Sequence, residues 1–383
     1  MTEAGPRTPN ALLRYFARSR SLADFATGRD NNFNLIRMAL ATMVLIHHGF
    51  VLTGNPILPT NPLTRLVSDF GEIGVDGFFA VSGFLVTRSL LARHDVKAFV
   101  AARVLRIFPG LWVMLIVTTL ALTALSELPA KQYLTDHATW SYVAHNATAF
   151  FIAFQLPGVF LHQPSGGVNG SLWSLHYELL CYIGVAAAGV LGLAKRRWPF
   201  VLAVLACAAL FIAIPGEPEY FIGLLRRLGL LFGLGSVAAA YAPKIPLRAV
   251  IAAGLFALAF LLDGTLVAPI SWSLAYAYGL LWLAYVPSGV IRQFNRLPDI
   301  SYGLYIYAFP VQQTLIATGL ALSPLRNMVG SWLVVSVLAT LSWYAIEKPA
   351  LALKDRLGRQ RDPRVDAAVR LRDSAVAADG DGR

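Results

Sequence analysis

An arginine and a histidine lie within one apolar stretch of this chain, at Arg37 and His48 in the segment 32–52. Eleven positions separate them, and at roughly 100° per residue this is three helical turns, so both side chains point to one helix face, about 16 Å apart along the axis. Ionisable groups at membrane depth are rare and usually line a protein interior or a functional path. Histidine commonly removes the proton of a hydroxyl, and arginine can stabilise a developing oxyanion. The pair therefore predicts a site that works across a bilayer.

Both residues also have a purely structural interpretation. A histidine in a membrane helix can be a packing residue that is hydrogen-bonded to a neighbouring helix. Arg37 can be an inner-leaflet anchor whose long side chain reaches the membrane surface. The adjacent His47 diverges from His48 by about 100° and does not share the face of Arg37.

The composition indicates an integral membrane protein. Mean hydropathy is +0.59, and 56% of the residues are hydrophobic while only 14% are charged. Apolar runs recur that are long enough to cross a hydrocarbon core of about 30 Å. We therefore expect an all-α fold with about ten transmembrane helices. Their approximate ranges are 32–52, 73–91, 108–127, 171–193, 198–214, 220–241, 247–262, 268–286, 299–320 and 327–346.

The basic residues are distributed unevenly between the two sides of this topology. Of the 32 Lys and Arg, 25 fall in the segments that share a side with both termini, and the opposite loops hold only Arg65, Lys131 and Arg326. This is the positive-inside pattern, which places both termini in the cytoplasm. It also explains the net charge of +11 without nucleic acid as a partner. The two cysteines lie inside apolar runs, so neither a disulfide framework nor a metal site is expected.

Three regions follow from these patterns. Residues 1–31 form a cytoplasmic N-terminal segment, and residues 32–350 form the transmembrane domain. Residues 351–383 are charged and Ala-rich, which predicts a short helix followed by a largely disordered tail. A long outer loop, 129–170, is rich in aromatic residues and predicts an interfacial or re-entrant helix and then a turn.

A second arginine pair, Arg103 and Arg106, stands at the cytoplasmic mouth of the third predicted span. Residues three apart are neighbours on a helix surface, so the two guanidinium groups form a fork suited to phosphate. The alternative is simple anchoring by the positive-inside rule.

Two carboxylates belong to the predicted spans. Glu178 lies about two helical turns below the outer surface, where Arg226 and Arg227 are candidate counter-charges. It could be a member of a structural pair, a partner of a catalytic base or an acceptor-site residue. Asp76 is near the outer surface, where it could be solvated.

Small residues and a proline mark two of these helices. Gly77 and Gly83 permit close packing of the second predicted span. Pro310 predicts a kink in the ninth span, and the residues Glu347 to Pro349 predict the end of the tenth.

Several of these segments together resemble the membrane acyltransferase family 3, bacterial O-acyltransferases that modify cell-surface and secreted glycans. The resemblance covers about residues 32–350, in the family's order. The matching pieces are Arg37 and His48, Gly74–Leu85, Arg103 and Arg106 before Pro109, Trp173–Glu178, Ser301 and Tyr302 with Pro310, and Glu347–Pro349.

The resemblance implies a transferase of the bacterial inner membrane that uses acyl-CoA, usually acetyl-CoA, as donor substrate and not as a permanently bound cofactor. It implies a glycan hydroxyl as acceptor and membrane lipid as the surroundings. The catalytic residues would be Arg37 and His48, and the acyl-CoA-binding residues Arg103 and Arg106. Residues on the acceptor side, or supporting the base, would be Glu178, His176, Asp76 and Tyr302. Many relatives have His where Ala308 stands.

The sequence leaves the mechanism and the function class open. His48 could act as a base in direct transfer, or as a nucleophile that forms a covalent acyl-histidine. Buried ionisable groups in ten spans would also suit a transporter or flippase for a glycan or lipid-linked solute. A structural subunit of an envelope assembly is a third interpretation.

Overall fold

The structure is a computed structural model that describes residues 20–28, 30–93, 95–216 and 220–359. These residues are mostly helical and form no β-strand; one isolated bridge pairs Ser21 with Pro246. The α-helices are α2 (Leu22–Phe25), α3 (Phe33–Leu52), α4 (Pro62–Ser68), α5 (Phe70–Arg93), α6 (Val96–Ala121), α7 (Ala130–Thr135), α8 (His137–Ala147), α9 (Trp173–Val190), α10 (Trp198–Ala213), α11 (Tyr220–Ala240), α12 (Ala249–Leu261), α13 (Ala268–Tyr285), α14 (Ser301–Ala317), α15 (Pro324–Ser342) and α16 (Lys348–Arg359). The short 3-10 helices are η1 (Leu122–Leu125), η2 (Gly170–Leu172), η3 (Leu193–Arg196), η4 (Ala242–Lys244) and η5 (Val290–Arg296), and η6 (Trp343–Glu347) is a π-helix.

Each of the ten apolar runs contains a helix, and the all-α prediction is confirmed. Within the described ranges, five helices are long and apolar enough to span a membrane. A sixth results if α13 and η5, which meet at a bend of 89°, form one broken span. The other runs give helices that are shorter or less apolar, such as α12 with 13 residues. Ten spans, and the cytoplasmic location of both termini, therefore stay predictions.

Helix α6 begins well before the predicted third span. Residues 96–107 precede the predicted span of 108–127, yet they belong to this helix, which starts at Val96 and carries Arg103 and Arg106 on its first turns. The side chain of Asp95 caps it by accepting a hydrogen bond from the backbone N–H of Ala98 at 3.0 Å. Charge decides whether a segment enters lipid and does not decide whether it is helical, so this boundary was wrong.

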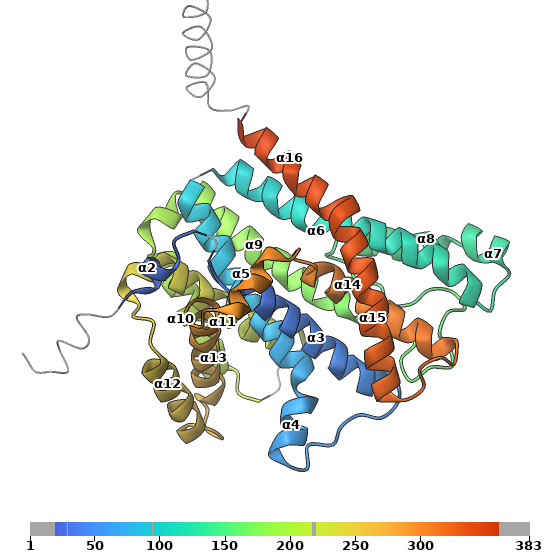
Figure 1. Ribbon diagram of the computed structural model, residues 1–383, viewed down its shortest axis with the longest axis horizontal. Coiled ribbons are helices and arrows are strands. Elements are labelled where there is room, and N and C mark those ends of the chain that lie inside the picture. Colours follow the sequence, from blue (N-terminus) through green and yellow to red (C-terminus); the bar gives the residue numbers. More distant parts are fainter. Residues whose placement is uncertain (1–19, 29, 94, 217–219, 360–383) are drawn as a thin grey trace, which may run out of the picture.

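Helices α3 and α5 cross the middle of the molecule (Figure 1), and glycines let their neighbours approach closely. A Cβ at Gly83 of α5 would collide with the backbone carbonyl of Phe232 in α11. A Cβ at Gly77 would meet the side chain of Leu40 in α3. The close packing predicted for these two glycines is present, and it joins α3, α5 and α11 into one core.

Helix α14 lies on the other side of α3 and is the most enclosed helix of the fold. Every residue from Ser301 to Pro310 is buried. Pro310 is inside this helix, and the kink expected there stays a prediction. Ser301, Tyr302 and Tyr305 of this helix form one wall of the site described below.

The chain stays helical at Glu347 to Pro349, where the end of the tenth span was predicted. Helix α15 continues through the π-helix η6 into α16, and Pro349 occupies the first turn of α16. Proline lacks the N–H that would continue the ladder of this unbroken helix, and the π-turn directly before it is where the helix accommodates the interruption. The prediction of a helix end was therefore wrong, and the wider π-turn carries Glu347 into the interior, where it is buried.

The long loop 129–170 contains α7 and α8 and then an irregular segment up to Asn169 (Figure 1). The helix predicted after residue 350 is present in α16, while residues 360–383 lie outside the described residues.

Candidate active site

One cavity opens between α3, α5, α6, α9 and α14, with an empty volume of about 800 Å³ including its open mouth. Its lining combines three arginines, a carboxylate and several hydroxyl groups with an apolar wall. The lining residues are Arg37, Val75, Phe78, Phe79, Val81, Ser82, Leu85, Val86, Arg103, Arg106, Ile107, Ser174, Leu175, Glu178, Tyr182, Ser301, Tyr302 and Tyr305.

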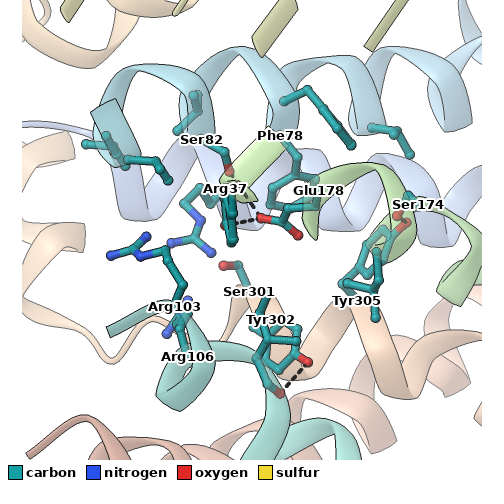
Figure 2. A pocket seen from close by; sticks show the side chains of 18 residues that line it. Arg37, Phe78, Ser82, Arg103, Arg106, Ser174, Glu178, Ser301, Tyr302 and Tyr305 are labelled. Carbon is teal, nitrogen blue, oxygen red and sulfur yellow. Dashed lines mark hydrogen bonds between the residues drawn. The ribbon is translucent and has the colours of Figure 1, made fainter. Parts of the chain in front are cut away.

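The charges are not spread evenly through this cavity. Figure 2 shows the arginines at one end and the Ser174–Tyr305 pair at the other, with Glu178 between them. The tyrosine hydroxyl lies 2.7 Å from the hydroxyl of Ser174. The cavity therefore has a cationic end and an uncharged, aromatic end.

A carboxylate behind the lining holds two of the arginines. Arg37 Nη1 and Arg106 Nη2 both lie 2.7 Å from Oδ2 of Asp299. A second nitrogen of Arg106 lies 3.7 Å from Glu347 in the π-helix. Sequence reasoning missed Asp299; the signal was an acidic residue at the edge of a span, directly after a basic loop.

Arg103 differs from its two neighbours. Within the described residues the structure shows no ion pair for it, and its buried Nε has no hydrogen-bond partner. Its guanidinium lies over the rings of Tyr182, at 5.8 Å from the ring centroid, and Phe99, at 6.0 Å. Arg103 is thus a cavity-lining cation, supported by aromatic rings, that is available to an anion from outside.

Glu178 is held by hydroxyl groups and not by the arginines expected from the sequence. It accepts a hydrogen bond from the hydroxyl of Tyr182 and a longer one, 3.5 Å, from Ser82. Tyr182 lies one turn after Glu178 on the same helix, so α9 itself positions this carboxylate.

Arg226 and Arg227 have other partners. Arg227 pairs with Glu72 at 2.7 Å and with Asp76 at 2.9 Å, both on α5. Arg226 donates to two backbone carbonyls of the turn between α10 and α11. The proposed pairing with Glu178 was therefore wrong. The prediction that Asp76 is solvated was also wrong, because this side chain faces Arg227 of α11 and not solvent.

His48 is not part of the cavity lining. Its ring packs against Phe309 of α14, with 5.0 Å between the centroids, and its Nδ1 is buried without a hydrogen-bond partner among the described residues. Arg37 and His48 both lie on the side of α3 that faces α14. Arg37 is paired there with Asp299, and His48 packs against Phe309. Phe309 follows the cavity-lining Tyr305 by one helical turn, about 6 Å. One aromatic turn of α14 thus separates the cavity from the histidine.

The two remaining candidates lie in different places. Tyr302 lines the cavity, donates its hydroxyl to the carbonyl of Ile107 at 2.8 Å and supports Arg106 with its ring. His176 is on the far face of α9, where Nδ1 lies 3.0 Å from the carbonyl of Phe150. The fold therefore gathers five of the eight candidate residues at one cavity and leaves out three. The five are Arg37, Arg103, Arg106, Glu178 and Tyr302, and the three are His48, His176 and Asp76.

Comparison with known proteins gives a consistent result. A protein-family model described as an acyltransferase domain matches residues 30–348. The chain is 29% identical to an O-acetyl transferase of Shigella phage Sf6, over 84% of this chain and 96% of that relative. It is also 29% identical to nodulation protein 10 of Rhizobium leguminosarum bv. viciae, over 88% of this chain and 98% of that relative. No solved structure matches the chain significantly. With a cationic cavity inside a bundle of apolar helices, and a family match over most of its length, the chain belongs to the family of membrane acyltransferases.

Proposed function

We propose that this acyltransferase takes an acetyl group from acetyl-CoA and transfers it to a hydroxyl of a cell-surface or exported glycan. The observation that carries the donor assignment is Arg103, the lining arginine without an ion pair in the described residues. Acetyl-CoA has phosphate groups at one end and a thioester at the end of a neutral arm. A cavity with a cationic end and a hydroxyl-rich aromatic end suits both parts of such a molecule.

Each end of the cavity has a role in this proposal. Arg103 and Arg106, near the start of α6, hold the phosphates, and the arm extends along α14 toward Tyr305. Arg37 shares Asp299 with Arg106 and therefore adds its charge to the group that holds the donor. Entry from the cytoplasmic side follows from the excess of basic residues on the side of α6 where these arginines lie.

His48 acts as the base in the proposed reaction. The acceptor reaches it from the side opposite to the arginines, and a displacement of the Phe309 ring brings the acyl group into contact with it. His48 removes the proton of the acceptor hydroxyl, whose oxygen forms a bond to the thioester carbon. The carbon–sulfur bond breaks, and the departing CoA sulfur takes the proton from His48. The unpartnered Nδ1 supports this role, because a base needs a free lone pair.

The name of one relative and the membrane setting support parts of this proposal. The phage relative is named an O-acetyl transferase, which supports acetyl as the group and oxygen as the acceptor atom. The membrane setting supports an acceptor that is exported or lipid-linked, since a cavity inside a helix bundle can be reached from both sides of a bilayer.

The test is CoA binding and acetyl release by purified protein in liposomes. Arg103→Ala should bind CoA roughly 10- to 100-fold more weakly than wild type, which corresponds to about 1.5–3 kcal/mol for a hydrogen bond to a charged group. Arg196→Ala is the matched control, because it removes an exposed arginine outside the cavity and should bind CoA like wild type. Labelled acetyl should leave acetyl-CoA more slowly in Arg103→Ala at low donor concentration. Wild-type protein that neither binds CoA nor releases acetyl would exclude this donor.

A further inference from the structure

Asp299 joins the two arginines that face the cavity from α3 and α6. A single oxygen, Oδ2, accepts from Arg37 and from Arg106 at 2.7 Å each. The two donating nitrogens are therefore at most about 5.4 Å apart, twice this distance. Two like charges at such a separation repel strongly when no carboxylate lies between them.

The orientation of this carboxylate is fixed by its own chain. Its other oxygen, Oδ1, accepts the hydroxyl of Ser301 at 2.6 Å, and the backbone N–H of that residue at 3.4 Å. Ser301 is the first residue of α14, the most enclosed helix. Asp299 thus transmits the position of α14 to the guanidinium groups of the two neighbouring helices.

The low exposure of these three side chains makes their ion pairs strong. The side chains of Arg37, Asp299 and Arg106 are 22%, 16% and 13% exposed. Partial shielding from water strengthens charge-assisted hydrogen bonds compared with those on a surface. Asp299 does not line the cavity itself, so it holds the arginines from behind.

The two arginines differ in how much they depend on it. Arg106 has a second carboxylate nearby, Glu347, and the rings of Tyr302 and Trp343. For Arg37 the structure shows Asp299 as the one ion-pair partner within the described residues. Loss of this carboxylate would therefore release Arg37 more than Arg106.

We infer that Asp299 is a positioning residue with two effects on the site. It orients Arg37 beside Arg106 for contact with the donor, and its negative charge offsets the arginines so that the CoA product is bound weakly enough to leave. The inference rests on the proposed use of acyl-CoA as donor. It predicts effects of opposite sign on binding and on turnover, which a merely structural role would not produce.

The experiment compares Asp299→Asn with wild type in liposomes, using CoA and pantetheine as binding probes. The variant keeps the size and one acceptor oxygen but loses the charge. It should bind CoA about tenfold more tightly, because one negative charge near the phosphates is gone. Its affinity for pantetheine, which lacks the phosphates, should not change. Acetyl release from acetyl-CoA at saturating donor should fall about tenfold, because CoA that is bound tenfold more tightly leaves more slowly.

Two further variants separate charge and position from a general loss of stability. Asp299→Glu retains the charge, so its CoA affinity should stay close to that of wild type and its turnover should exceed that of Asp299→Asn. Asp95→Asn removes one carboxylate from the cap of α6 and keeps the capping hydrogen bond, so its CoA affinity and turnover should match wild type. Melting temperatures measured alongside identify any variant that does not fold.

The outcomes distinguish this inference from the proposed function. If wild type binds CoA while Asp299→Asn binds it equally or more weakly, or turns over at the wild-type rate, the inference is wrong and the donor stands. Equal tightening for pantetheine and CoA would also overturn it, since shape and not charge would then have changed. If wild type does not bind CoA, the donor assignment and this inference fall together.

Discussion

Asn169 donates its side-chain amide to the carbonyl oxygen of Ile306 at 2.8 Å, four residues before Pro310. In a regular helix this carbonyl would accept from the backbone N–H of residue 310, which proline lacks. The side-chain amide of Asn169 replaces that donor. Its side-chain oxygen Oδ1 accepts a hydrogen bond from the backbone N–H of Ser171 at 3.1 Å. The last residues of the loop 129–170 are therefore hydrogen-bonded to α14 at the point where the proline interrupts its backbone hydrogen bonds.

The Asn169 contact should contribute to stability in a way that depends on the proline. Asn169→Ala leaves a buried carbonyl without a donor, which costs about 1–3 kcal/mol and should lower the melting temperature in detergent. In a Pro310→Ala background the helix N–H is restored, so the same substitution should cost clearly less. Equal losses in both backgrounds would show that the two residues do not act on the same carbonyl.

The two adjacent histidines should differ in importance. The Nδ1 of His47 lies 2.8 Å from the carbonyl of Ser68, so this ring connects α3 to α4. His48 has a free Nδ1 and is the proposed base. His48→Ala should reduce acetyl transfer roughly 10²- to 10⁴-fold, whereas His47→Ala should retain most of the activity. The measurement is transfer of labelled acetyl by the two variants, provided that their melting temperatures are similar. Similar losses of activity in both variants would contradict the proposed role of His48 as the base.

Phe309 should control contact between the cavity and His48. Its ring packs against His48 and against the position of Gly170, where a Cβ would collide with it. Phe309→Leu opens this partition, so release of labelled acetate from acetyl-CoA without any acceptor should rise several-fold. Phe200→Leu shortens a buried ring in α10, away from the cavity, and should leave this rate unchanged. An unchanged or lower rate in Phe309→Leu, with normal CoA binding, argues against a partition.

Two glycine substitutions should change stability with opposite signs. Gly83→Ala places a methyl group against the backbone of Phe232 and should destabilise the protein by about 1–3 kcal/mol. Gly184→Ala, in α9, meets nothing within 4 Å and should stabilise by about 0.5–1 kcal/mol through helix propensity. Thermal unfolding in one detergent compares the two directly. If Gly83→Ala melts at or above the wild-type temperature, the close approach of α5 and α11 is not as described.

Much of the helical framework could be predicted because its cause is local. A run of apolar residues is helical in a membrane whatever surrounds it, since the backbone groups must bond within the segment. This explains why each predicted run contains a helix. The end predicted at Pro349 was wrong because the π-turn before this proline lets the helix continue past it. Helix boundaries depend on caps such as Asp95, which weigh little in a hydropathy pattern.

The pairing of charges could not be predicted because it is not local. Asp299 is separated from Arg37 by 262 positions and from Arg106 by 193. Arg227 was expected to serve Glu178 but meets Asp76, because α11 packs against α5 on the face that carries this aspartate. Depth in a membrane restricts which charges can meet, and the rotation of each helix about its axis selects among them.

The sequence by itself determined that apolar helices carry Arg37 and His48 on one face and Arg103 with Arg106 on another, because helical periodicity depends only on neighbouring residues. Only the tertiary structure decided that Arg37 would enter a shared cavity while His48 would stop against Phe309. The reason is that both residues face α14, a helix about 260 positions later in the chain, whose side chains differ at the two depths.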